Sequence, residues 1–564
     1  MNKLSYIHKG ETGSMSFETK QRSFTQGLFM LYGLGVAFFL LIALVQLFQL
    51  TIVKGSYYTL LSDDNRIKEI IIEAPRGVIN DRKGIPLATS TKQNIRDDTG
   101  RLESRRIYKY AEEISHIVGY RQYADSDDLD NDSCLNKLKY GDKVGKKGVE
   151  QLFECELRGK HGKRLIEVDT HGNYTKTLSV LEPIEGETIN LALDIELQKK
   201  AIELLGDKKG VVVGLKPDTG EVLILASTPG FDPQSFEDGD TSASEVFITD
   251  TNKPLFNRAT EGTYPPGSTF KLFVAAAGLE EGVIEANDTI EDKGVLEAGP
   301  LKFHNWYYLE YGRTDGEVDM LKALQRSNDI YFYLLGEKLG PEKIKKWAEL
   351  FGMQNTTGIG LSESVGIIPS TFWKHDTLGE RWFLGDTYNL SIGQGYVATT
   401  PLQIARGTAA FANDGYLCEP KLLKSTSKDT SPCTKIPMSS KTYDLIREGM
   451  HQVCSVGGTG YPFFDFSVNQ QSESNNEETS VTTIDTSESS SSAMITRKIE
   501  VGCKTGTAES HAKSGMPHAW FTVFAPYENS EIVLTVLVEE GGQGSDIAAP
   551  IAKEILKVYF ERYE

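Results

Sequence analysis

Positive charge is in short supply in this sequence. Lys and Arg together number 60 of 564 residues, Asp and Glu number 79, and the net charge is −19. Proteins that bind nucleic acid normally carry a basic patch or stripe, so this balance argues against a nucleic-acid partner. The acidic excess is interpreted as a well-solvated surface. The length favours several domains, and a hydrophobic share of 39% supplies enough apolar residues for their cores.

Cysteine is also scarce. The chain has six cysteines, and none form the C-x-x-C spacing of zinc ribbons and thioredoxin-like motifs. We therefore expect neither a metal site nor a cofactor. Six cysteines in a chain of this length do not make a disulfide framework, so most are interpreted as buried thiols, although an oxidising exterior would permit a bridge. They are Cys134, Cys155, Cys418, Cys433, Cys454 and Cys503.

Charged residues are absent between Phe24 and Val53. About 20 apolar residues are enough for a helix to cross the hydrocarbon core of a membrane. A buried core helix rarely goes so long without a charge. A cleaved signal peptide would have a shorter apolar stretch and a small-x-small cleavage site after it. The sequence therefore predicts a retained transmembrane helix over residues 24–53.

The segment before this helix, residues 1–23, carries more basic than acidic residues. The positive-inside rule makes it a cytoplasmic tail and places everything after about Lys54 outside. We therefore expect a single-pass protein of the cytoplasmic membrane. The charged residues of the tail are Lys3, Lys9, Lys20 and Arg22 against Glu11 and Glu18.

The exterior part has two regions. Residues 54–185 are mixed in pattern and punctuated by glycine. From residue 186 the pattern changes: residues 188–193 read as a strand, Asp194 caps a helix over 195–205, and a turn at 217–220 joins strands at 210–215 and 221–226. Near the end, residues 532–538 read as a buried strand, and 547–559 have helical spacing. Strands at both ends of a helix-rich middle indicate an α+β domain with one antiparallel sheet.

An acidic run at residues 125–132 has part of the pattern of a calcium-binding loop that begins at Asp128. Ser133, however, stands where the sharp turn needs glycine, and Lys139 stands where the bidentate glutamate belongs. We interpret the run as a solvated loop.

Residues 467–493 lack Lys, Arg, Gly and Pro altogether, and hold nine serines and five acidic residues. Such a segment buries too little apolar surface to offset the entropy of ordering. It is interpreted as a disordered insert.

The motif S-x-x-K occurs three times, starting at Ser268, Ser425 and Ser510. Only the first copy stands at a junction between a turn and a helix: residues 264–267 form a Tyr-Pro-Pro-Gly turn, and residues 270–277 are strongly apolar. The spacing of three puts Ser268 and Lys271 on one face of that helix. A serine hydroxyl needs a base to become a nucleophile, and a desolvated, neutral lysine can serve. The helix N-terminus also favours a developing oxyanion.

A second element is Ser327-Asn328-Asp329, which precedes an apolar run. The hydroxyl of Ser327 could relay a proton to a leaving amine, and Asp329 could hold a lysine in place. In isolation, the preferred interpretation is a polar helix cap.

The third element is Lys504-Thr505-Gly506-Thr507, in a segment that reads as a strand. Lys504 and Thr505 can bind a substrate carboxylate. Gly506 would leave room for a ligand backbone to lie alongside the strand. K-T-G occurs once in the chain.

Together, and in this order, the three elements match the catalytic set of penicillin-binding proteins and β-lactamases. The chain closely resembles the class B penicillin-binding proteins, the monofunctional peptidoglycan transpeptidases, over nearly its whole length. Segments at 74–82, 148–151, 157–159, 257–259 and 264–268 resemble motifs of that family, and 385–395 with 400–403 resemble its elongation branch. The resemblance implies a pedestal (dimerisation-like) domain at 54–185 and a transpeptidase domain at 186–564, of the serine β-lactamase-like fold.

The resemblance also implies a role for each residue. Ser268 would form an acyl-enzyme with a D-Ala-D-Ala stem peptide of peptidoglycan, and Lys271 would be its general base. Ser327 and Asp329 would assist proton transfer. An amine on a neighbouring strand would then accept the acyl group, and β-lactam antibiotics would acylate the same serine.

On the strand, Lys504 and Thr505 would hold the terminal carboxylate, and the backbone N–H groups of Ser268 and Thr507 would form the oxyanion hole. The family further implies a polytopic glycosyltransferase partner of the SEDS type and other wall-elongation proteins. Cys503 departs from the pattern, because the family usually has Gly there; a small thiol would fit but could narrow the cleft. The serine-rich insert before this strand is the other departure.

Other classes of protein use the same serine acylation chemistry. A β-lactamase or a β-lactam sensor has the same catalytic set, a D,D-carboxypeptidase differs only in using water as acceptor, and an inactive scaffold would only organise wall synthesis. The pedestal resemblance and the single anchor favour a transpeptidase.

Overall fold

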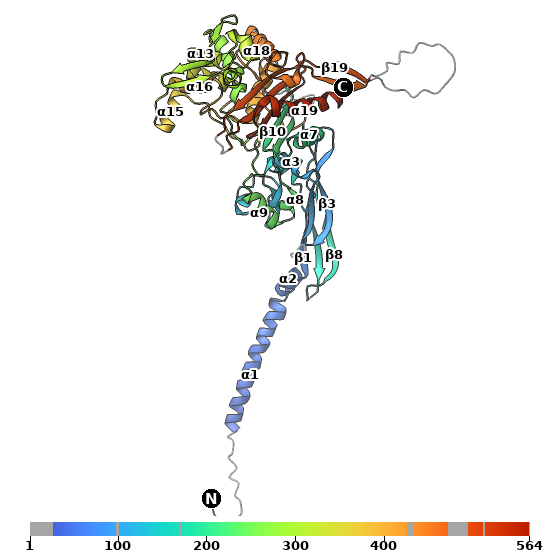
Figure 1. Ribbon diagram of the computed structural model, residues 1–564. Coiled ribbons are helices and arrows are strands. Elements are labelled where there is room, and N and C mark those ends of the chain that lie inside the picture. The colour runs from blue at the N-terminus through green and yellow to red at the C-terminus, as the bar shows by residue number, and fades with distance from the viewer. Residues whose placement is uncertain are drawn as a thin grey trace, which may run out of the picture. The chain divides into compact units, whose positions relative to one another are not determined.

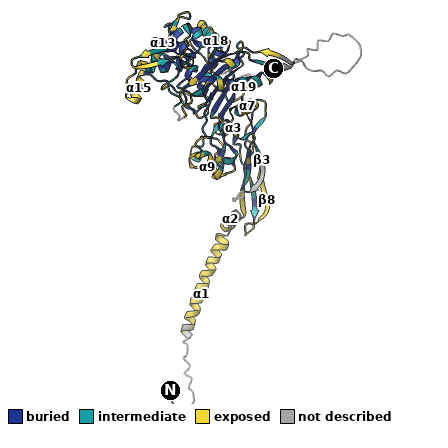
Figure 2. Cartoon of the chain, viewed as in Figure 1, coloured by how far each residue is buried: buried dark blue, intermediate teal, exposed yellow. Residues whose placement is uncertain are grey.

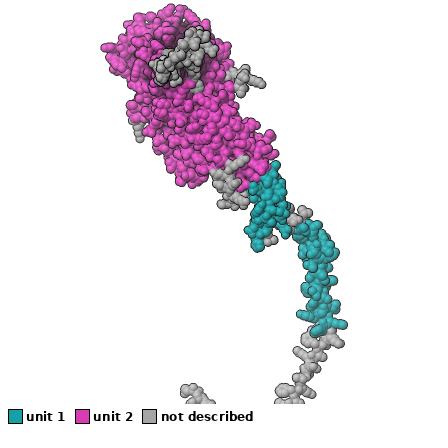
Figure 3. Space-filling model, turned by 90° about the vertical axis from the view of Figure 1, so that its right-hand side faces the viewer, with its two compact units in different colours: residues 1–70, 163–181 teal, residues 71–162, 182–564 magenta. Residues whose placement is uncertain are grey.

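The computed structural model describes residues 26–96, 101–169, 171–425, 432–471, 494–510 and 514–562. The chain divides into two compact units, which Figure 3 colours separately. The first contains residues 1–70 and 163–181, and the second contains residues 71–162 and 182–564. The pedestal boundary predicted at residue 185 lies inside the second unit and stays a prediction.

The first unit is built on a long apolar helix. Helix α1 (Gln26–Phe48) continues through a π-helical turn (Gln49–Val53), and α2 (Gly55–Arg66) follows. Residues Phe29–Val53 are long and apolar enough to cross a membrane, and none of that stretch is buried in the protein. Figure 2 shows α1 in the colour of exposed residues. The unit also contains the antiparallel pair β7 (Gly162–Val168) and β8 (Tyr174–Leu181).

Buried ion pairs explain why residues 71–162 belong to the second unit. Glu150 bonds to both Arg76 and Arg106, and all three side chains are almost fully buried. Arg121 binds Glu237 at 2.7 Å, and Glu237 lies beyond residue 185, on α8 (Gln234–Glu237). Separating these partners would leave buried charges uncompensated, which costs several kcal/mol per pair. The predicted pedestal and catalytic regions are thus joined by charge as well as by packing.

This first part of the second unit consists of short elements. After β1 (Ile67–Ile72), which crosses from the first unit, they are β2 (Ile79–Asn80), β3 (Pro86–Arg96), β4 (Leu102–Tyr108), α3 (Ala111–Val118), β5 (Arg121–Tyr123), α4 (Ser126–Asp130), β6 (Lys143–Gly145), α5 (Gly148–Leu152), α6 (Glu154–Leu157) and β9 (Ile189–Asn190). The strand expected at 188–193 is only two residues long, because residue 191 onward leads directly to the cap of the next helix.

A five-stranded antiparallel sheet forms the centre of the remainder (Figure 1). Its order is β11 (Val222–Thr228), β10 (Gly210–Leu215), β22 (Ile532–Val538), β21 (His518–Ala525) and β20 (Gly502–Ala508). The hairpin of β10 and β11 and the buried strand β22 confirm the sequence prediction. Asp194 caps α7 (Ile195–Leu205), as expected, by accepting from the backbone N–H groups of Glu196 and Leu197.

Alternation along the strands gives the sheet two apolar faces. Val211 and Val213 pack in the core with α10 (Lys271–Glu280) and α17 (Pro401–Ala412), whereas Val212 packs with α7 and α19 (Ala549–Arg562). β20 is an edge strand of this sheet, and its Gly506 lies against Thr269, just before α10.

The second unit contains further elements along the rest of its chain. They are α9 (Thr241–Thr249), the 3-10 helix Gly267–Phe270, β12 (Ile290–Asp292), β13 (Val295–Ala298), β14 (Leu301–His304), α11 (Trp306–Tyr311), β15 (Gly316–Val318), α12 (Met320–Gln325), α13 (Asp329–Leu339), α14 (Pro341–Leu350), α15 (Thr371–Leu378), α16 (Leu384–Ser391), β16 (Tyr416–Cys418), β17 (Cys433–Lys435), α18 (Ser440–Val453), the 3-10 helix Tyr461–Phe463, β18 (Ser467–Gln471), β19 (Met494–Lys498) and the π-helical turn Gly544–Ala548.

The cysteines correct the sequence analysis. They form three disulfides, Cys134–Cys155, Cys418–Cys433 and Cys454–Cys503, rather than buried thiols. The partners are 21, 15 and 49 residues apart, so only the fold brings them together. The Cys454–Cys503 bridge joins the end of α18 to β20, the strand that carries the K-T-G motif.

The insert also differs from its expected boundaries. Its first five residues form β18, which pairs with β19 in an antiparallel hairpin. Val468 is buried against the core that contains α19, and this burial stabilises the strand. Residues 472–493 lie outside the described residues. The acidic run is partly helical: Asp125 caps α4, and within the described residues no cluster could hold a metal ion.

Candidate active site

The nucleophile turn is set by a glycine. Gly267 has φ +54°, and a Cβ there would lie 2.8 Å from the carbonyl oxygen of Thr507. Only glycine tolerates both the left-handed backbone and this close approach. Ser268 follows in the 3-10 helix that continues into α10, at the helix start that the sequence predicted. The apolar residues of α10 are buried, so this end of the helix is held firmly.

Lys271 is fully buried one turn along from Ser268. Its Nζ donates to Asp329 Oδ1 at 2.6 Å and to the Ser327 carbonyl at 2.8 Å, and lies 3.5 Å from Ser327 Oγ. Burial lowers the pKa of Lys271 below its ordinary value, although the carboxylate of Asp329 opposes this shift. In the described part of the chain these contacts all go to the second motif, and none goes to the Ser268 hydroxyl.

The second motif combines both roles that its sequence suggested. Asn328 caps α13 by accepting from the backbone N–H of Tyr331, which is the helix-cap interpretation. Ser327, at φ +53°, turns its hydroxyl away from that helix toward the two lysines. Asp329 holds Lys271, and its second oxygen accepts from the backbone N–H of Trp306.

Lys504 of β20 is also fully buried. Its Nζ donates to Ser327 Oγ at 2.8 Å and to its neighbour's carbonyl, that of Thr505, at 3.0 Å. Burial, with a further contribution from nearby Lys271, lowers the pKa of Lys504 well below its ordinary value. Ser327 thus lies between two buried lysine amines, each with a pKa below its ordinary value. The predicted role of Lys504 at the substrate carboxylate stays a prediction; in this structure its Nζ bonds to the Ser327 hydroxyl.

Gly506 also allows close packing beside the nucleophile. A Cβ at this position would lie 2.9 Å from Trp520 Cβ and 3.0 Å from Thr269 Cγ2. The missing side chain therefore allows β20 to pack against the nucleophile helix and its neighbouring strand, and Gly506 also lines the cavity.

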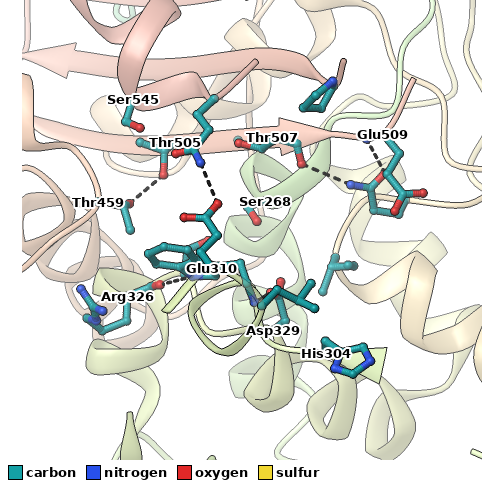
Figure 4. A pocket seen from close by; sticks show the side chains of 18 of the residues that line it. Ser268, His304, Glu310, Arg326, Asp329, Thr459, Thr505, Thr507, Glu509 and Ser545 are labelled. Carbon is teal, nitrogen blue, oxygen red and sulfur yellow. Dashed lines mark hydrogen bonds between the residues drawn. The ribbon is translucent and has the colours of Figure 1, made fainter. Parts of the chain in front are cut away.

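Ser268 opens onto a cavity of about 930 Å³. Figure 4 shows Ser268 below the strand that carries Thr505 and Thr507, with Asp329 on the opposite side. The hydroxyls of Thr505 and Thr459 are 2.7 Å apart on one wall. Further lining residues that the sequence analysis did not select are Trp306, Glu310, Arg326, Gln394, Gln543 and Asp546.

Two of the cavity-lining residues, Thr459 and Gln394, stand in sequence patterns that indicate a functional position. Thr459 stands in a Gly-Gly-Thr-Gly segment and Gln394 in Gly-Gln-Gly, and glycines around one polar residue favour a close backbone approach. The aromatic helix α11, where Arg326 stacks on Trp306 and Tyr307, had no such signal.

The other two S-x-x-K copies lack this setting. Ser425 follows a loop, and its backbone N–H donates to Glu221. Ser510 lines the same cavity, but its hydroxyl donates to the Met516 carbonyl. The lysines of both copies, Lys428 and Lys513, lie outside the described residues. Ser268 is therefore the candidate nucleophile among the three copies.

Comparison with known protein families matches residues 210–557 to the penicillin-binding protein transpeptidase domain, and residues 99–191 to the penicillin-binding protein dimerisation domain. The first match alone covers more than half of the chain. This chain belongs to the penicillin-binding protein transpeptidase family.

This transpeptidase is similar in sequence to its relatives over most of its length. It is 32% identical to the peptidoglycan D,D-transpeptidase MrdA of Haemophilus influenzae, over 81% of this chain and 70% of that protein. It is 28% identical to MrdA of Escherichia coli K12, over 93% and 92%. The predicted class, a class B enzyme of the elongation type with serine D,D-transpeptidase chemistry, is confirmed.

Solved structures agree in fold. The penicillin-binding protein 2 of Pseudomonas aeruginosa, solved in complex with WCK 5153, has a TM-score of 0.70 at 30% identity, covering 87% of this transpeptidase and 96% of that chain. Penicillin-binding protein 2 of Helicobacter pylori, solved in complex with MreC, has a TM-score of 0.71 at 27% identity, covering 88% and 99%. The predicted α+β fold with an antiparallel sheet is likewise confirmed.

Proposed function

We propose that Ser268 is the nucleophile with which this D,D-transpeptidase cross-links the stem peptides of peptidoglycan. One observation carries the proposal: Ser268, at the start of a helix, faces the cavity that Thr505 and Thr507 line from the edge strand, while two buried lysines meet at Ser327 behind it. The resulting acyl-enzyme is also the species in which β-lactam antibiotics would be trapped.

In the acylation step, the oxygen of Ser268 attacks the carbonyl carbon of the D-Ala-D-Ala amide, and its proton passes to the neutral amine of Lys271. The lowered pKa of Lys271 favours this neutral form. When the C–N bond breaks, the leaving D-Ala amine takes a proton through the Ser327 hydroxyl, which Lys271 resupplies. The acceptor amine then attacks the ester carbon and loses its proton to the same lysine, which passes it to the Ser268 oxygen as the ester C–O bond breaks.

Groups at the cavity wall bind the two negative charges of the reacting substrate. The developing oxyanion is bound by the backbone N–H groups of Ser268 and Thr507. The terminal carboxylate is bound by the hydroxyl of Thr505, and Lys504 supports this site from behind through its bond to the Thr505 carbonyl. Asp329 keeps Lys271 in place.

The apolar helix anchors the enzyme in the cytoplasmic membrane, with the N-terminal tail in the cytoplasm and the catalytic unit outside. Basic residues in the tail and three disulfides in the exterior part support this orientation, because disulfides persist in oxidising compartments. Partners include a SEDS-type glycosyltransferase and other wall-elongation proteins. The complex of the Helicobacter pylori relative with MreC supports the second of these.

The test is the fate of the acyl group. Purified enzyme is given a stem-peptide donor ending in D-Ala-D-Ala together with a D-amino acid as acceptor, and products are separated by mass. Amide product dominating over hydrolysed product supports a transpeptidase, and Ser268→Ala should abolish both. Hydrolysis that dominates at saturating acceptor would favour a D,D-carboxypeptidase. Rapid turnover of a penicillin would favour a β-lactamase.

A further inference from the structure

The loop that follows α16 contacts both sides of the proposed oxyanion hole. The carbonyl of Gly393 accepts from the backbone N–H of Gly267, the residue before the nucleophile, at 2.9 Å. The next side chain, Gln394, donates from Nε2 to the carbonyl of Thr507 at 3.2 Å. Its Oε1 accepts from the backbone N–H of Glu509 at 3.3 Å. Figure 4 shows the two bonds to Thr507 and Glu509 on the strand side of the cavity.

This loop is itself fixed. The backbone N–H groups of Gly393 and Gln394 donate to the carbonyls of Leu390 and Asn389, at 3.1 and 2.9 Å. Gly393 has φ +71°, and a Cβ there would lie only 2.4 Å from the Gly267 carbonyl oxygen. The loop therefore packs directly against the nucleophile turn, in a conformation that requires glycine.

The two hydrogen bonds of Gln394 take the place of bonds that a further strand would make with β20. β20 is an edge strand, and the two bonds satisfy the carbonyl of Thr507 and the N–H of Glu509 on its open side. In a strand, the N–H and the carbonyl of one residue point to the same side. Holding the Thr507 carbonyl therefore also fixes the direction of the Thr507 N–H, one of the two oxyanion donors.

We propose that Gln394 is a positioning residue of the oxyanion hole, which sets the Thr507 N–H relative to the Ser268 N–H. The inference rests on the proposed function, because it needs an oxyanion to form between those two groups. A donor that is preorganised toward the developing charge contributes far more than one that must reorient, so a small displacement of the Thr507 peptide slows acylation.

The experiment compares two substrates in the full-length protein: a D-alanine ester donor, and the thionoester analogue in which sulfur replaces the carbonyl oxygen. Sulfur accepts hydrogen bonds weakly, so the thionoester gains less from an oxyanion hole. Two variants test the side chain. Gln394→Met keeps its length without either bond, and Gln394→Glu keeps its shape but sets a carboxylate against the Thr507 carbonyl. Gln543→Met is the matched control, because Gln543 lines the same cavity but bonds to Glu310.

We expect acylation by the ester to fall about 10- to 100-fold in both Gln394 variants, with a much smaller fall for the thionoester, so that the ester-to-thionoester rate ratio shrinks. Gln543→Met should leave that ratio unchanged. Equal losses for the two substrates, or no loss for either, would overturn the inference. Failure of the proposed function looks different: the unchanged protein would then carry no acyl group on Ser268 with either substrate.

Discussion

Removal of the Cys454–Cys503 disulfide should weaken both the fold and the active site. The bridge closes a loop of 49 residues, which includes residues 472–493. Loop-closure entropy gives such a cross-link about 4 kcal/mol of stability. Cys503 also stands next to Lys504 and ties β20 to the end of α18. Replacing both cysteines by alanine should therefore also let β20 shift, which should slow acylation. A tenfold loss of acylation rate corresponds to a barrier that is about 1.4 kcal/mol higher.

The control is the Cys134–Cys155 pair, which closes 21 residues in a part of the unit that contributes no cavity-lining residue. Removing this bridge should lower the free energy of unfolding by about 3 kcal/mol, by the same loop-closure entropy, and should leave the acylation rate unchanged. Urea unfolding and second-order acylation by a fluorescent penicillin measure the two effects. If the Cys454/Cys503 variant loses stability but acylates at the native rate, the bridge does not position β20. If it loses neither, the two cysteines are not paired in the protein.

Three further predictions concern the base, its protonation and the insert. Lys271→Ala should lower the rate of β-lactam acylation by about 10²–10⁴-fold with the fold intact by circular dichroism; a native rate would place the base elsewhere. Acylation should accelerate as pH rises through the lowered pKa of Lys271, because only the neutral amine accepts a proton. The carboxylate of Asp329 raises that pKa, so Asp329→Asn should move the rising limb of a stopped-flow pH profile to lower pH, and a shift to higher pH would contradict this. Replacing residues 472–493 by a short Gly/Ser linker should leave acylation nearly unchanged, since each doubling of loop length costs only about 0.6 kcal/mol; a loss beyond about tenfold would show that the insert shapes the cleft.

Features that depend on neighbouring residues could be predicted from the sequence. The hairpin of β10 and β11 follows from two apolar runs around a turn. The cap of α7 follows from Asp194, and the nucleophile's position follows from a rigid turn before an apolar helix. In each case the residues that decide the structure lie within a few positions of one another, so local propensity and the final fold agree.

Features that depend on distant partners could not be predicted in the same way. Lys504 is the best example: the sequence did not show that its buried amine bonds to the Ser327 hydroxyl. The pairing of Arg121 with Glu237 is another, because it joins segments more than a hundred residues apart. Neither contact leaves a periodic or compositional trace in the sequence.

The most direct test of the central claim is mass spectrometry of the protein after treatment with a β-lactam. The account predicts a single covalent adduct, found after proteolysis on the peptide that contains Ser268 and lost in Ser268→Ala. An adduct on the peptide that contains Ser425 or Ser510, or none on a folded protein, would contradict the assignment of Ser268 as the nucleophile.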